Sequence, residues 1–254
     1  MKRVGGLFFL GFCLLFFSTI FATEKRGIVS YVEGDVKKQP PATELWENAP
    51  VNTPVMTGDR VRTYLDSRAE LELIQLDIIR LAPKTIVDIM KLYEETKEKK
   101  LKTEIRVETG EIWASVHEVS AETEFDIAAP LAMAAITGTV FRMKVDEDST
   151  TQLKVYKGEV KITNAPASLN LTPQSLKPYQ IQGPRPVEGP HEVSLEQWMY
   201  IIKSMQQITI DKQGKVVSVG KFSPKDPEEK TPWVEWNKKR EKMRLKRIQE
   251  LEKK

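Results

Sequence analysis

The chain has 254 residues, of which 40% are hydrophobic and 30% are charged, and its formal net charge is +3 at pH 7. This composition is typical of a globular protein and excludes both a disordered chain and one embedded throughout in a membrane. The length fits one medium-sized domain with an appendage. The C-terminus is locally basic, because residues 237–254 contain nine Lys/Arg and three Glu.

The N-terminus has the pattern of an export signal. Met1–Arg3 is basic, the run from Val4 to Ala22 is apolar and uncharged, and charges resume at Glu24. This order predicts a signal peptide over residues 1–22. The alternative is an uncleaved membrane anchor, because an apolar run of about 19 residues is long enough to cross a bilayer. Both interpretations place the rest of the chain outside the cytoplasm, so we expect a periplasmic or secreted protein.

Cysteine chemistry is excluded once the signal is removed. The single cysteine, Cys13, lies inside the apolar run. A mature chain without cysteine has no disulfide bonds and no thiolate site, so its fold must be held by its core.

The body of the chain predicts an all-β fold. From Gly27 to Thr163, short segments alternate between apolar and polar residues and are separated by turn signals, as in Ala69–Ile74. Many short strands at close intervals are typical of an antiparallel β-sandwich, a barrel or a pair of curled β-sheets.

A small motif recurs within these strands. In Val32–Val36, Val107–Ile112 and Val155–Val160, a glycine separates two β-branched runs. Glycine readily takes the positive φ of a tight turn, so we expect a hairpin that is used three times.

The remaining segments divide the chain further. The charged stretch from Lys91 to Lys102 is expected to be an exposed hairpin loop or a short helix. Residues 164–222 predict a proline-rich wrap, a short amphipathic helix over Ser194–Ile202 and a closing hairpin over Ile208–Val219. Residues 223–254 predict a linker and a basic tail, which is either helical or mobile.

Candidates for catalysis and for metal binding are few. His117 and His191 have no nucleophile motif beside them, and the chain lacks the His/Cys set that a zinc site needs. The acids of Asp146–Asp148 lack the spacing of a Ca²⁺ loop and fit the tip of a hairpin. In the β region, aromatic residues are not interleaved with a basic patch. We therefore expect no enzyme activity, no cofactor and no nucleic-acid partner.

An ordered series of motifs resembles the FecR family over about residues 27–163. It includes Val55–Thr63 with its Gly-Asp pair, Val107–Val116, and Phe125–Phe141 with its Ala-Pro and Gly-Thr elements. The resemblance implies an extracytoplasmic, β-rich interaction module. The residues carried over define the fold rather than a ligand site: Gly34, Gly58, Asp59, Thr63, Gly110, Pro130, Gly138, Thr139, Phe141 and Gly158.

Two features limit what the resemblance implies. Thr137 stands where arginine is common before Gly-Thr, so no role of that arginine is carried over. The family takes its name from a regulator with a cytoplasmic segment that contacts a sigma factor. Only Met1–Arg3 precede the apolar run, so sigma-factor control is not expected here.

The predicted function is therefore a non-catalytic interaction or sensing module that binds a protein or an envelope polymer. One alternative is a membrane-anchored signal relay, and another is an envelope enzyme that acts on carbohydrate through a carboxylate pair. The tail from Trp233 to Lys254 is expected to act either as a contact arm for acidic partners or anionic lipid headgroups, or as a solubilising end.

Overall fold

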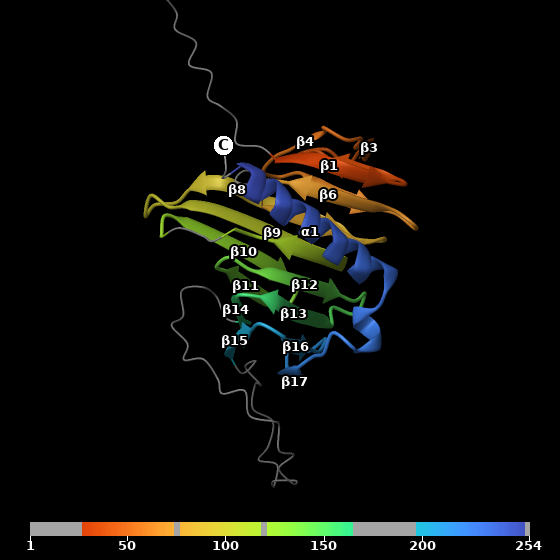
Figure 1. Cartoon of the computed structure of the whole chain (residues 1–254). Coiled ribbons are helices and arrows are strands. Elements are labelled where there is room, and N and C mark those ends of the chain that lie inside the picture. The colour runs from red at the N-terminus through yellow and green to blue at the C-terminus, as the bar shows by residue number, and fades with distance from the viewer. Residues whose placement is uncertain (1–26, 74–76, 118–120, 165–196, 252–254) are drawn as a thin grey trace, which may run out of the picture.

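The computed structural model describes residues 27–73, 77–117, 121–164 and 197–251 (Figure 1). The predicted signal over residues 1–22, most of the proline-rich stretch and His191 lie outside the described residues. Within the described ranges, seventeen strands form one continuous sheet, followed by a 3₁₀ turn, η2 (Pro227–Glu229), and a helix, α1 (Pro232–Leu251). The predicted all-β fold is confirmed.

The sheet folds over on itself into two layers. Layer A contains β1 (Gly27–Glu33), β4 (Pro54–Val55), β6 (Arg68–Glu72), β7 (Ile78–Leu81), β12 (Val140–Val145), β13 (Thr151–Lys157), β16 (Gln206–Ile210) and β17 (Val216–Lys221). Layer B contains β2 (Val36–Gln39), β3 (Glu47–Asn48), β5 (Arg60–Thr63), β8 (Ile86–Glu95), β10 (Thr123–Ala129), β11 (Ala132–Ile136), β14 (Glu159–Thr163) and β15 (Met199–Lys203).

The strand β9 (Leu101–Ser115) joins the layers, because its two halves belong to different ones. Its first half pairs with β8 and β10 in layer B, and its second half pairs with β7 and β12 in layer A. The pairing of β9 with β10 is parallel, with Thr123 opposite Leu101. The sheets are therefore antiparallel except at this pair.

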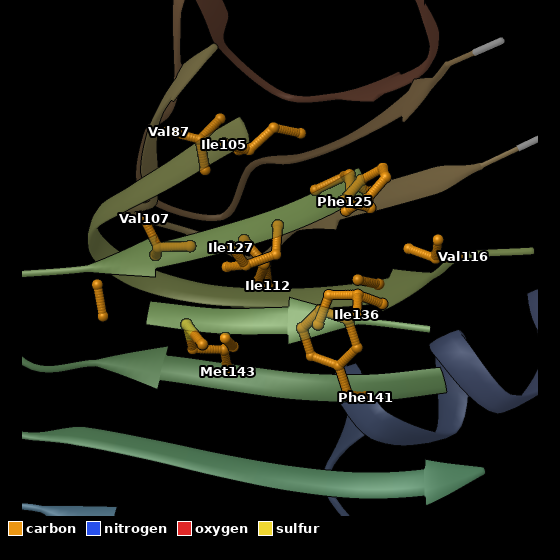
Figure 2. Close-up of a cluster of buried hydrophobic side chains, with 14 of the residues drawn as sticks. Val87, Ile105, Val107, Ile112, Val116, Phe125, Ile127, Ile136, Phe141 and Met143 are labelled. Carbon is orange, nitrogen blue, oxygen red and sulfur yellow. The ribbon is translucent and has the colours of Figure 1, made fainter. Parts of the chain in front are cut away.

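A single core fills the space between the layers. Apolar residues of both layers point inward and form one buried cluster, as the alternation along the strands requires (Figure 2). Ile105 and Ile127 enter it from layer B, and Ile112, Phe141 and Met143 enter it from layer A. Phe141, predicted to define the fold, is fully buried there.

The glycine motif does not form hairpins, so that prediction is wrong. At Gly34 and Gly158 the chain crosses from one layer to the other, and at Gly110 the continuous strand β9 bends between them. A hairpin and a crossing both require a residue with positive φ, so the local sequence is the same. Only the partners of the flanking strands distinguish the two.

The crossings are stacked in two rows at opposite edges of the layers. The first row is joined by hydrogen bonds between successive crossings, such as Asp35 N to Ser67 Oγ (2.8 Å) and Glu111 N to Thr85 Oγ1 (3.0 Å). The second row contains Gly138, Gly158 and Met205. The two rows lie at opposite ends of β12. The start of β12, which follows Gly138, pairs with Ser115 of β9, and the end of β12 pairs with Gly110.

Several local predictions are settled by the pairing of strands. Lys91–Lys102 lies in a long hairpin of β8 and β9, which was one of the two expected forms. The closing hairpin is confirmed as β16 and β17, and the tail is helical in α1. The short amphipathic helix is wrong for its described part, because Met199 begins β15, which pairs with β14. Within the described residues, no helix is both long enough and apolar enough to span a membrane.

The stacked crossings predict a specific sensitivity at Gly110. Its φ is +96°, and a Cβ would lie 2.5 Å from the Cα of Thr85 in the neighbouring crossing. Gly110→Ala should therefore lower the free energy of unfolding by about 2–4 kcal/mol, from backbone strain and overpacking. Gly220→Ala is the control, because a Cβ there meets nothing within 4 Å. Equal denaturation midpoints for the two variants would contradict the role of the stacked crossings.

Candidate functional site

Four strands of layer A carry a buried charged side chain on the face that points away from the core. They are Glu70 in β6, Arg80 in β7, Arg142 in β12 and Lys154 in β13, all at most 6% exposed. Their neighbours along each strand are core residues, so alternation directs the charges outward. Helix α1 and the η2 turn cover this face (Figure 1). We call it the helix-docking face.

Aromatic packing anchors the first turn of α1. Trp233 and Val234 are buried and join Trp113 in a small cluster separate from the main core. The ring of Trp113 stacks on Tyr156 with 4.3 Å between centroids, and Trp233 stacks on Trp236 at 5.4 Å. Buried aromatic area of this kind supplies most of the apolar stabilisation of such a contact.

Beyond this anchor, α1 is held by ion pairs. The Glu70 carboxylate accepts hydrogen bonds from Arg80 Nε (2.6 Å) on the sheet and from Arg240 Nη2 (2.8 Å) on the helix. Arg80 also pairs with Glu241 of the helix at 3.4 Å. Burial raises the pKa of Glu70, but the hydrogen bonds and charges of Arg240 and Arg80 outweigh it and hold the pKa at about 2.

A second cluster surrounds Glu229 at the end of η2. Its carboxylate accepts a hydrogen bond from the Tyr156 hydroxyl (2.9 Å) and pairs with Lys154 at 3.3 Å, Lys238 at 3.6 Å and Arg142 at 3.7 Å. Glu229 is 2% exposed, so this set of partners offsets the cost of burying its charge.

The far end of the docked helix is held at Arg244. Its guanidinium lies 2.8 Å from Ser115 Oγ, 3.1 Å from Glu241 Oε1 and 2.7 Å from His117 Nδ1. The backbone N–H of His117 donates to Asp77 Oδ1 at 2.8 Å. His117 therefore serves the packing of α1.

A groove of about 650 Å³ runs beside the start of α1, near the first row of crossings. Its lining mixes acids and bases, including Lys84, Glu111, Arg142 and Lys144. Burial raises the pKa of Glu111, and Arg142 opposes that rise. The acids predicted to form a hairpin tip, Asp146–Asp148, lie between β12 and β13, and two of them line this groove. In the described part of the chain, no group of three or more His, Cys, Asp or Glu side chains is arranged to hold a metal ion.

The residues predicted from sequence lie away from the helix-docking face, with Gly110 at the edge of the groove. Thr63 and Gly34 lie in the first row of crossings, where Thr63 Oγ1 donates to Ala82 O. Gly138, Thr139 and Gly158 lie in the second row, where a Cβ on Gly158 would contact the other two. The other predicted residues lie elsewhere. Gly58 and Asp59 form a turn before β5, where the Asp59 carboxylate accepts a hydrogen bond from Met56 N. Pro130 is exposed between β10 and β11. These positions form no single site.

Sequence reasoning missed the helix-docking face itself. Glu70, Arg80, Arg142 and Lys154 each lie between two apolar residues of a strand, and a sequence alone does not distinguish this pattern from the solvent side of an alternating strand. The available signal was the repetition of the same pattern in four strands, together with two tryptophans at the start of a basic helix.

The ion pairs of Glu70 predict an acid-sensitive stability. Because the pKa of Glu70 is lower in the folded chain than its ordinary value of 4.5, its stabilisation is full above that value and is lost as the pH falls toward 2. Glu70→Gln should remove this dependence and lower the free energy of unfolding by about 3 kcal/mol at pH 7. Denaturant titrations across pH measure both effects. Glu33→Gln is the control, because Glu33 forms a more exposed pair with Arg68. It should change the free energy of unfolding by less than about 0.5 kcal/mol.

Asp77 predicts the opposite pH dependence. Burial raises its pKa to about 6, although the His117 N–H and Arg244 oppose the rise. The folded chain therefore binds this proton more tightly than the unfolded chain, so the stability contributed is full below pH 3.8 and is lost as the pH rises through 6. Asp77→Asn keeps an acceptor for the His117 N–H. It should remove a decline of about 3 kcal/mol in the free energy of unfolding over this pH range. An unchanged pH profile of unfolding would contradict the assignment.

Comparison with known proteins identifies the domain that presents this face. The model of the FecR protein family matches residues 59–161, which include all four buried charges of the helix-docking face. No curated protein matches the chain in sequence. Two crystal structures of "a putative anti-sigma factor" from Parabacteroides distasonis match 64% of this chain at 13% identity and a TM-score of 0.44, and the chain spans 59% of their length. Residues 59–161 of the chain therefore match a FecR domain.

Proposed function

We propose that this chain is a non-catalytic interaction or sensing module that acts outside the cytoplasm and binds a protein or another envelope component. One observation carries the proposal: the FecR domain already binds a helix. Helix α1 lies beyond the matched residues 59–161, and the domain holds it through the ion pairs Arg240–Glu70 and Arg80–Glu241 and through aromatic packing.

The chemistry of the helix-docking face favours binding over turnover. A general acid or base works best with a pKa near the operating pH and with access to substrate. Glu70 is held ionised, with a pKa of about 2, between two guanidinium groups. Asp77 has a pKa of about 6, but it is 4% exposed and accepts a hydrogen bond from the chain at His117. These groups hold a helix in place, as a recognition surface does.

Two observations support a place outside the cytoplasm. The basic start and apolar run of residues 1–22 have the order of an export signal, and the FecR resemblance implies an extracytoplasmic module. The same apolar run, if retained, would anchor the chain as part of a signal relay.

Crosslinking in the native cell tests the proposal. An affinity-tagged copy is crosslinked and purified, and both the attached species and the first residue of the chain are identified by mass spectrometry. We expect an envelope protein or polymer joined to a chain that begins near Thr23. A cytoplasmic copy that lacks residues 1–22 is the control for non-specific capture. Turnover of a glycan by the purified protein, lost when a specific acidic pair is changed, would contradict the non-catalytic assignment.

A further inference from the structure

Docking divides the basic residues of the C-terminal helix into two sets. Lys238, Arg240 and Arg244 face the protein and contact Glu229, Glu70, and Ser115 with Glu241, respectively. Lys239, Lys242 and Lys246 are exposed, and none of them forms an ion pair with a described residue. The first set serves the fold, which leaves the second set available for a partner.

The exposed lysines form one row. Their spacing of three and four residues places them on the same side of a helix, over about 10 Å along its axis. Met243, 53% exposed, lies beside them, and Leu245, 44% exposed, lies at the flank of the helix next to Glu241. We call these five residues the lysine row.

Because α1 lies along the outside of layer A, one side of the helix faces away from the sheet (Figure 1). Two acids, Glu235 and Glu250, are also exposed on the helix, one before the row and one after it. The centre of the outward side is therefore cationic, with apolar side chains between and beside the lysines.

We propose that the lysine row docks the protein on an anionic lipid membrane. Lysines attract anionic headgroups within a Debye length, and adjacent apolar side chains enter the headgroup boundary, as in helices that lie in a membrane interface. A compact polyanion in solution would leave Met243 and Leu245 without an apolar environment. The proposal rests on the proposed function and deepens it by naming one envelope component. If membrane binding fails, a protein partner captured by crosslinking would still support the proposed function.

Vesicle cosedimentation of the full chain tests the proposal. We expect binding to vesicles containing phosphatidylglycerol, weaker binding at 500 mM salt, and little binding to phosphatidylcholine vesicles. The variant K239Q/K242Q/K246Q keeps good helix formers and should reduce partitioning about 100-fold. The control K157Q/K161Q/K203Q removes the same charge from exposed lysines of β13, β14 and β15 and should bind as the parent does.

Three further results separate the sources of binding. M243A/L245A should weaken vesicle binding while leaving thermal stability unchanged, since both side chains are exposed. Competition by free glycerol phosphate at millimolar concentration would show a headgroup site in place of a membrane surface and would overturn the proposal. Equal loss in the two lysine variants, or binding to heparin without binding to vesicles, would also overturn it.

Discussion

The fold depends on a chain that passes repeatedly between two sheet layers. Strand β9 belongs to both layers and bends at Gly110, where φ is +96° and the backbone lies against Thr85 of the neighbouring crossing. The other crossings stack on one another in the same manner, so each layer is held in register with the other at its edges. This rigid frame aligns four outward charges on β6 and β7 on one side of β9 and on β12 and β13 on its other side. Helix α1 can bind there only because the strands present those charges in a fixed pattern.

Docking of α1 combines two kinds of interaction with different ranges. The aromatic cluster at Trp233 and Trp113 fixes where the helix begins, through packing that depends on shape. The ion pairs of Arg240 and Arg244 then fix its direction along the sheet. Glu70 stabilises the fold when it is ionised and Asp77 when it is protonated, so the two carboxyl groups give opposite pH dependences. The helix thus uses one side for the fold and keeps the other for contacts with the surroundings.

Much of the fold, but little of the candidate site, could be predicted from the sequence. Alternation in Ala69–Ile74 correctly predicts β6, because the period of two is a local property. The same alternation assigns Glu70 to solvent, and its partner Arg240 lies 170 positions away, where no local pattern connects them. Gly158 was assigned to a hairpin for a similar reason, since positive φ suits both a reversal and a crossing. Met199 and Ile202 have helical spacing, but pairing with β14 makes their segment a strand.

The central claim is that the FecR domain binds α1 through specific charge pairs, and a double-mutant cycle between Glu70 and Arg240 tests it most directly. The two side chains approach to 2.8 Å, and Glu70 is 6% exposed. The free energy of unfolding is measured for E70Q, R240Q, the double variant and the parent at pH 7. We predict a coupling energy of about 2 kcal/mol, within the range for residues that share a buried network. Additive effects, with no coupling, would show that the Glu70–Arg240 pair does not hold the helix and would contradict the account.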